Sequence, residues 1–169
     1  MAKDDSVFIY IGTYPDELSA RADYEIVKDL HAAGVVGTYD AAVVTKDADG
    51  KVHENKDETS TRHGAWGGLA VGAVVGLLFP PSIIASAAVG AAVGGVGAHL
   101  WKGMSRSDVK ELGDLIDNGQ AALVIVGESK VAEAVENADL KAMQQVSKQL
   151  DISSKDIDQA IKDAAGEVS

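Results

Sequence analysis

The stretch AALVIVG, residues 121–127, contains no charged or polar side chain. A run of this length that is apolar throughout is typical of a strand covered on both faces, because a half-exposed strand would alternate apolar and polar residues. We therefore expect residues 121–127 to form a central strand. The rest of the fold is predicted from the segments that can pack around it.

The N-terminal part of the chain supplies the first partners of this strand. Residues 7–11, VFIYI, are β-branched and aromatic and predict a strand that ends at Gly12 and Pro15. Apolar residues then recur at helical spacing from 16 to 33, which predicts a helix with one face toward the sheet. That face is expected to carry Leu18, Ala22, Ile26, Val27 and Leu30.

A hairpin is predicted next. Residues 39–45, YDAAVVT, read as a strand, and DADG at 47–50 is turn chemistry that leads into a polar return strand at 51–54. The DADG sequence also begins like a calcium loop. Its glycine occupies the fourth position rather than the sixth, however, so we interpret it as a hairpin turn.

Further helices are predicted from Ser105 or Ser107 to about residue 117, from 131 to 150, and from 153 to 165. Without residues 63–102 the order is then strand, helix, strand, strand, helix, strand. This is the order of a ferredoxin-like α+β sandwich, an antiparallel sheet with two helices on one face. The predicted organisation is a discontinuous domain of residues 1–62 and 103–138, an inserted α-helical hairpin of 63–102, and a C-terminal helical extension of 139–169.

The inserted segment is distinguished by its small residues. Residues 63–101 contain no Asp, Glu, Lys or Arg, and small residues recur at every fourth position on both sides of Pro80-Pro81. On a helix this spacing forms a stripe that lets two backbones approach closely, the glycine-zipper pattern of membrane helices. The residues predicted to mediate helix packing and oligomerisation are Gly64, Gly68, Gly72, Gly76, Ser86, Gly90, Gly94 and Ala98.

Both lipid and protein could cover this hairpin. As helices, residues 64–79 and 82–101 would be about 24 Å and about 30 Å long, against a hydrocarbon core of about 30 Å. Aromatic and basic residues at the open end favour a membrane, whereas the low content of Leu, Ile and Phe in the second arm favours burial between subunits. A disordered, aggregation-prone hairpin is a third alternative. The predicted membrane-interface anchors are Trp66, Trp101, Arg62 and Lys102.

Charge and composition restrict the class of protein. The 169-residue chain has a formal net charge of −11 and a pI near 4.6, which argues against a nucleic-acid partner. It contains no cysteine, so thiol catalysis and zinc thiolate sites are excluded. The first residues, MAKDDSVFIYIG, do not resemble a cleavable signal peptide. We expect a location in the cytoplasm or at the cytoplasmic side of the inner membrane.

No catalytic, cofactor-binding or metal-binding residue is predicted. The four histidines lack metal-ligand spacing, although His63 and His99 could meet at the base of the hairpin. The glycine-rich segment 90–97 has neither a Walker A lysine nor the dinucleotide-binding order. Four tyrosines could line a pocket on the sheet face, but packing in the core is the preferred interpretation; they are Tyr10, Tyr14, Tyr24 and Tyr39.

Five segments resemble a bacterial family described only as domain of unknown function 1269 and often labelled a predicted membrane protein. They are VFIYIGTYPDELSARADYEIVKDLHAAG (7–34), YDAAVVTKDADGKV (39–52), GGLAVGAVVGLLFPP (67–81), GAAVGGVGAHL (90–100) and DVKELGDLIDNGQAALVIVGE (108–128). The resemblance implies a ferredoxin-like domain with a glycine-rich insertion and without established catalytic residues. It covers residues 7 to about 138, and the chain after 139 is less similar.

These observations predict a non-enzymatic, membrane-associated or self-assembling protein. Its glycine-zipper hairpin would mediate lipid contact and homo-oligomerisation, so its partners would be other copies of itself and a lipid bilayer. One alternative is a soluble high-order homo-oligomer with hairpins buried between subunits. Another is a small ferredoxin-like ligand-binding protein or enzyme.

Overall fold

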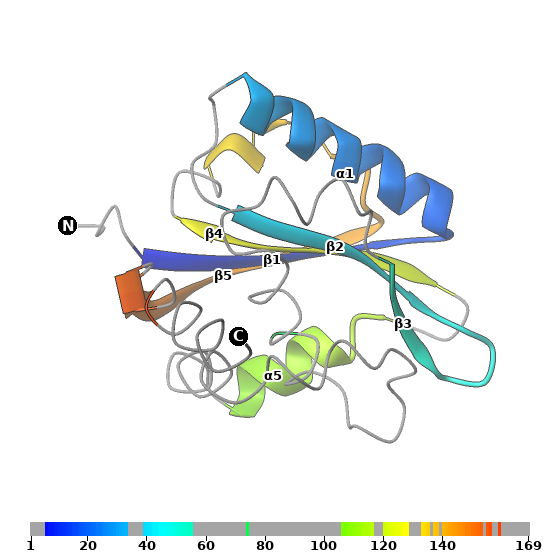
Figure 1. Ribbon diagram of the computed structural model, residues 1–169. Coiled ribbons are helices and arrows are strands. Elements are labelled where there is room, and N and C mark those ends of the chain that lie inside the picture. Colours follow the sequence, from blue (N-terminus) through cyan, green and yellow to red (C-terminus); the bar gives the residue numbers. More distant parts are fainter. Residues whose placement is uncertain are drawn as a thin grey trace, which may run out of the picture.

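The computed structural model describes residues 6–33, 39–55, 74, 106–116, 120–128, 133–135, 137–138, 140–153, 155–156 and 159. Its elements are, in order, β1 (Ser6–Tyr14), α1 (Glu17–Ala32), β2 (Tyr39–Lys46), β3 (Val52–Asn55), α5 (Arg106–Gly113), β4 (Ala121–Glu128) and β5 (Gln144–Ser153). The strands form one antiparallel sheet in the order β3-β2-β4-β1-β5 (Figure 1). The protein is therefore an α+β protein.

Strand β4 lies in the middle of this sheet, between β2 and β1. Val124 is opposite both Ala42 on β2 and Ile11 on β1, and every residue from 121 to 127 is buried. The prediction of a central strand covered on both faces is confirmed. Because α1 connects β1 to β2 across one face of the sheet, these two strands run in the same direction, and β4 fills the space between them antiparallel to both.

The core on the α1 side is aromatic. Alternate residues of β1 point toward α1. Asp16 caps the start of this helix, because its Oδ1 accepts a hydrogen bond from the Ser19 backbone N–H, at 2.8 Å. This bond holds the pKa of Asp16 below its usual value. Helix α1 lies over β2, β4 and β1 (Figure 1). The buried side chains of this core include Phe8, Tyr10, Tyr14, Ala20, Tyr24, Val27, Tyr39, Val43, Leu123 and Ile125.

The other face of the sheet carries α5 (Figure 1). Lys148 of β5 contacts Glu111 of α5, with Nζ 3.1 Å from Oε2, and the Lys46 ammonium of β2 donates to the carbonyl of Ile116, at 3.3 Å. The sequence predicted this helix but placed it on the same face as α1, whereas α5 lies on the opposite face (Figure 1). The apolar residues of the strands alternate to both sides, so each face needs its own cover.

Strand β5 corrects a second expectation, because residues 144–150 were predicted to be helical. In the structure β5 pairs antiparallel with β1, with Ser147 opposite Tyr10 and Val146 opposite Ile11. Glutamine, lysine and leucine are good helix formers, and an edge strand has only a weak alternating pattern. Pairing with β1 overrides the local preference.

Ser153 accepts at Oγ from the Asp156 N–H, at 3.2 Å, as expected for a helix that starts at residue 153.

The face that α1 turns toward the sheet also differs from the predicted one. Ala20, Asp23, Tyr24 and Val27 are buried, while Leu18 is 79% exposed. Of the predicted face, Val27 is buried and Ala22 is exposed. The helix is rotated because it buries Asp23 and Tyr24, which a count of apolar residues would place outside.

The predicted hairpin of residues 63–102 lies outside the described residues, with one exception. Val74 is helical and fully buried. Within the part of the chain that the structure describes, no helix is both long and apolar enough to cross a bilayer.

Candidate functional site

A buried carboxylate joins three segments of the chain at the end of β1. Asp23 of α1 is 1% exposed. Its Oδ2 accepts a hydrogen bond from the Tyr14 hydroxyl of β1, at 2.6 Å, and another from the backbone N–H of Lys141, at 2.7 Å. Asp23 therefore fastens α1 to β1 and to the residues that lead into β5.

The same end of the sheet carries a second polar contact. Tyr10 is 1% exposed, and its hydroxyl donates to Oε1 of Gln145 on β5, at 3.2 Å. The Tyr10 hydroxyl also occupies the space that a side chain at position 12 would need, since a Cβ on Gly12 would lie 2.5 Å from it. The Met143 N–H donates to the Thr13 carbonyl, at 2.8 Å. These contacts connect the start of β5 to the end of β1.

Burial raises the pKa of both tyrosines, and the hydrogen bond to Asp23 raises the pKa of Tyr14 further. Both hydroxyls therefore stay protonated at neutral pH, where they act as hydrogen-bond donors rather than bases. Among the described residues, no group of three or more His, Cys, Asp or Glu side chains could hold a metal ion. The polar contacts of Tyr10, Tyr14 and Asp23 are therefore suited to positioning α1 and β5 against β1.

We expect alkaline pH to destabilise the fold through these two tyrosines. Above pH about 10 the tyrosines of the unfolded chain lose their protons, whereas Tyr10 and Tyr14 of the folded protein keep theirs. The contribution of these two residues to the free energy of unfolding is therefore fully present below that pH and decreases above it. Each tyrosine should lower the unfolding free energy by about 1.4 kcal/mol per pH unit in this range. Urea unfolding between about pH 8 and about pH 11.5 measures this slope. Tyr14→Phe should reduce the slope, and an unchanged slope would contradict the assignment.

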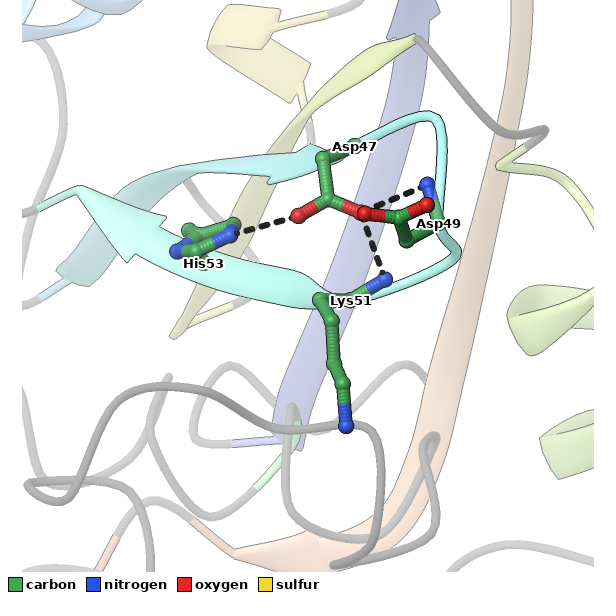
Figure 2. A network of polar contacts seen from close by, with 4 residues as sticks. All are labelled: Asp47, Asp49, Lys51 and His53. Carbon is green, nitrogen blue, oxygen red and sulfur yellow. Dashed lines mark hydrogen bonds and ion pairs between the residues drawn. The ribbon is translucent and has the colours of Figure 1, made fainter.

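The turn between β2 and β3 is a separate polar cluster (Figure 2). Asp47 accepts at Oδ1 from the N–H groups of Asp49 and Lys51, at 3.0 and 2.9 Å, and its Oδ2 lies 3.1 Å from His53 Nε2. Gly50 has φ 85°, a left-handed conformation that glycine adopts easily. The predicted hairpin turn is confirmed. The pKa of Asp47 lies below its usual value because its carboxylate accepts hydrogen bonds, and the bond with His53 has the largest effect.

The predictions for the residues of helix packing and membrane contact stay untested, because the structure does not describe these residues. Outside the described residues lie the packing set Gly64, Gly68, Gly72, Gly76, Ser86, Gly90, Gly94 and Ala98, and the anchors Trp66, Trp101, Arg62 and Lys102. His63 and His99 also lie there. By contrast, the four tyrosines considered for a pocket all belong to the buried core on the α1 side.

Sequence reasoning missed Asp23. An acidic residue in the middle of a surface helix is normally solvated, and nothing in the local pattern distinguishes Asp23 from Asp29, which is exposed. One signal was present, because the buried residues Ala20, Asp23, Tyr24 and Val27 follow the spacing of a single helix face. A second apolar stripe that contains Leu18 and Ile26 obscured it.

The geometry defines a class of protein: an α+β domain with a five-stranded antiparallel sheet, in which buried polar contacts join α1 and the start of β5 to β1. The chain belongs to the family described as Protein of unknown function (DUF1269), whose model matches residues 65–163, more than half of its length. The match extends to residue 163, although the chain after residue 139 was expected to be less similar to the family. No curated protein and no solved structure matches the chain.

Proposed function

We propose that this protein is a non-enzymatic, self-assembling protein in which a ferredoxin-like domain displays a glycine-zipper hairpin to other copies of itself and to a lipid bilayer. The supporting observation is the position of the uncharged block. Residues 63–101 are inserted between β3, at one edge of the sheet, and α5, on one of its faces. The domain therefore holds both ends of the block.

The ferredoxin-like part of the proposal rests on four strands. Strands β2, β4, β1 and β5 are neighbours in that order, and α1 connects two of them that are separated by β4. A split βαβ unit has such an order of strands, and this supports a ferredoxin-like domain. Strand β3 then extends the edge as a short hairpin, and the insertion follows it.

The charge distribution suits an assembly with a polar exterior. The net charge of −11 is carried entirely outside residues 63–101, so the domains repel each other while the insertions have no charge to keep them apart. Such a protein would form a layer of packed hairpins with acidic domains outside, at the cytoplasmic side of the membrane or in the cytoplasm.

Replacing Gly72 or Gly94 with leucine should abolish assembly, because a large side chain in the small-residue stripe separates the packed helices. We would express each variant without detergent and measure particle mass by light scattering after ultracentrifugation. Gly72→Ala is the matched control, since alanine preserves a small residue at that position and should assemble like the parent.

The outcomes separate the possible functions. Recovery of the parent in the membrane pellet, with release by detergent and not by salt, supports lipid contact, and a large soluble particle supports packing between subunits. Leucine variants that assemble like the parent would show that the zipper is not the interface. A small discrete oligomer that retains a bound ligand would favour a ligand-binding protein or an enzyme.

A further inference from the structure

Strand β5 is the long edge of the sheet (Figure 1). It has ten residues, whereas β3 at the other edge has four. Among the strands that the structure describes, β1 is the one neighbour of β5, so the backbone groups along the outer side of β5 meet no further strand of this sheet. A long edge of this kind is a template for pairing with another strand.

The usual protections of an edge strand are weak in β5. Residues 144–149 pair with β1 in one regular register and contain no proline. Their one charged side chain is Lys148, whose Nζ lies 3.1 Å from Oε2 of Glu111 on α5, so this charge is held over a face of the sheet rather than at its edge. Strand β3, by contrast, is protected by being short.

The surface of β5 on the α1 side is exposed and uncharged. Ser147 lies opposite Tyr10 of β1, and Tyr10 belongs to the core on the α1 side. Opposite residues of an antiparallel pair share a face, and side chains alternate along a strand, so Gln145, Ser147 and Gln149 all point to the α1 side. All three residues are exposed. Helix α1 therefore leaves this part of the sheet open to solvent.

We propose that β5 pairs antiparallel with β5 of a second copy of this chain, about a two-fold axis that passes through Ser147 perpendicular to the sheet. Such an axis places residues of the same face opposite each other, so Gln145 faces Gln149 of the second copy. Glutamine and serine side chains both donate and accept hydrogen bonds, so each is complementary to another copy of itself. A register centred on Lys148 would instead place two ammonium groups opposite each other, which is destabilising.

Charge identifies a second copy as the partner. The chain has a net charge of −11, so most of its surface repels another copy. Residues 144–150 contain no acidic residue, and their single charge is positive. Two copies therefore meet along β5 without bringing acidic residues of this segment together. Seven residues extend for about 23 Å, and pairing over this length joins two five-stranded sheets into one.

This inference deepens the proposed function, on which it rests for the formation of a layer but not for the pairing of β5 itself. A subunit with two different contacts, one through the hairpin and one through β5, connects to its neighbours in an extended layer. The β5 contact contains none of the zipper residues. Each contact is therefore removed by its own substitutions, and the two are tested separately.

A disulfide tests the pairing. The chain contains no cysteine, so Ser147→Cys introduces one thiol on the proposed axis. Directly opposite residues of an antiparallel pair have Cα atoms about 4.5–5.5 Å apart, which a disulfide can span. Gln144→Cys is the matched control on the same strand, because two copies of residue 144 would be about 20 Å apart. Covalent dimers are measured on non-reducing gels after mild oxidation, with and without Gly72→Leu, and light scattering of the same samples reports the zipper assembly.

Strand pairing predicts that Ser147→Cys forms covalent dimers at least about 10-fold faster than Gln144→Cys, with and without Gly72→Leu. Equal rates would mean that the thiols meet by collision, and the absence of dimers would mean that another segment or partner covers the edge. Dimers that disappear with Gly72→Leu would mean that the zipper alone brings the strands together. Each of these three results overturns the proposal. If Gly72→Leu still assembles, the proposed function has failed, and the comparison of the two thiols still decides the β5 contact.

Two charge variants test the register. Gln145→Glu with Gln149→Lys places opposite charges across the two-fold axis, whereas Gln145→Glu with Gln149→Glu places like charges there. Both keep an oxygen at position 145 that accepts from the Tyr10 hydroxyl. Each charge pair occurs twice in the interface, so cross-linking through Ser147→Cys should be about 10-fold faster with the opposite charges than with the like charges. Equal rates in the two variants contradict the proposed pairing.

Discussion

Replacing Asp23 with alanine should lower the free energy of unfolding by about 3 kcal/mol, because a buried and a partly buried donor lose their acceptor, and a buried group left unsatisfied costs about 1–3 kcal/mol. The donors are the Tyr14 hydroxyl and the Lys141 N–H, which both bond Oδ2 of this carboxylate. Urea unfolding followed by circular dichroism measures the change. Since the network connects α1, β1 and the start of β5, the loss should affect the whole domain in one transition.

Two variants test the specificity of this effect. Asp29→Ala changes an exposed aspartate of the same helix and should alter stability by less than about 0.5 kcal/mol. Asp23→Asn keeps one acceptor oxygen and should lose less stability than Asp23→Ala. If the alanine variants at positions 23 and 29 are equally stable, the buried network does not hold the fold.

Replacing Gly12 with alanine should lower the free energy of unfolding by about 2 kcal/mol, in the range for overpacking a core. Glycine in a strand is ordinarily unfavourable, so this substitution would stabilise most sheets. Here the added Cβ would lie 2.5 Å from the Tyr10 hydroxyl and 2.9 Å from Cβ of Ala142. One of these groups must move, and movement of Tyr10 breaks its hydrogen bond to Gln145.

Removing the Tyr10 hydroxyl should relieve part of this cost. We expect Tyr10→Phe and Gly12→Ala to be less destabilising together than the sum of the two single changes, because the closest contact of the new methyl group is gone. A double-mutant cycle measured by urea unfolding gives the coupling directly. Strict additivity would show that the hydroxyl is not the group that excludes a side chain at position 12.

The sequence was informative where one local signal determined the structure. The uniformly apolar run at 121–127 predicts a strand covered on both faces, and it is the central strand β4. At 47–50, Asp47 and Gly50 provide the side-chain acceptor and the left-handed backbone of a tight turn, and the turn is there. In both places the physical requirement is complete within a few residues.

The errors occurred where the deciding partner is distant in the chain. Residues 144–150 prefer a helix locally, but the free edge of β1 pairs with them across more than a hundred positions. Helix α1 is rotated because the Tyr14 hydroxyl meets Asp23, a contact that no periodicity of apolar residues encodes. Helix α5 lies on the face of the sheet that α1 leaves uncovered. Tertiary packing determines this face, and the local sequence of α5 does not.

The strand order also determines what the growing chain can do during synthesis. Strands β1 and β2 are made first but are not neighbours, and the position between them stays empty until β4 is complete at residue 128. Residue 102 is therefore synthesised about 1 to 5 seconds before β4 is complete, at about 5–20 residues per second. During that interval neither face of the finished sheet exists. The uncharged segment is therefore synthesised before a finished sheet is available to cover it.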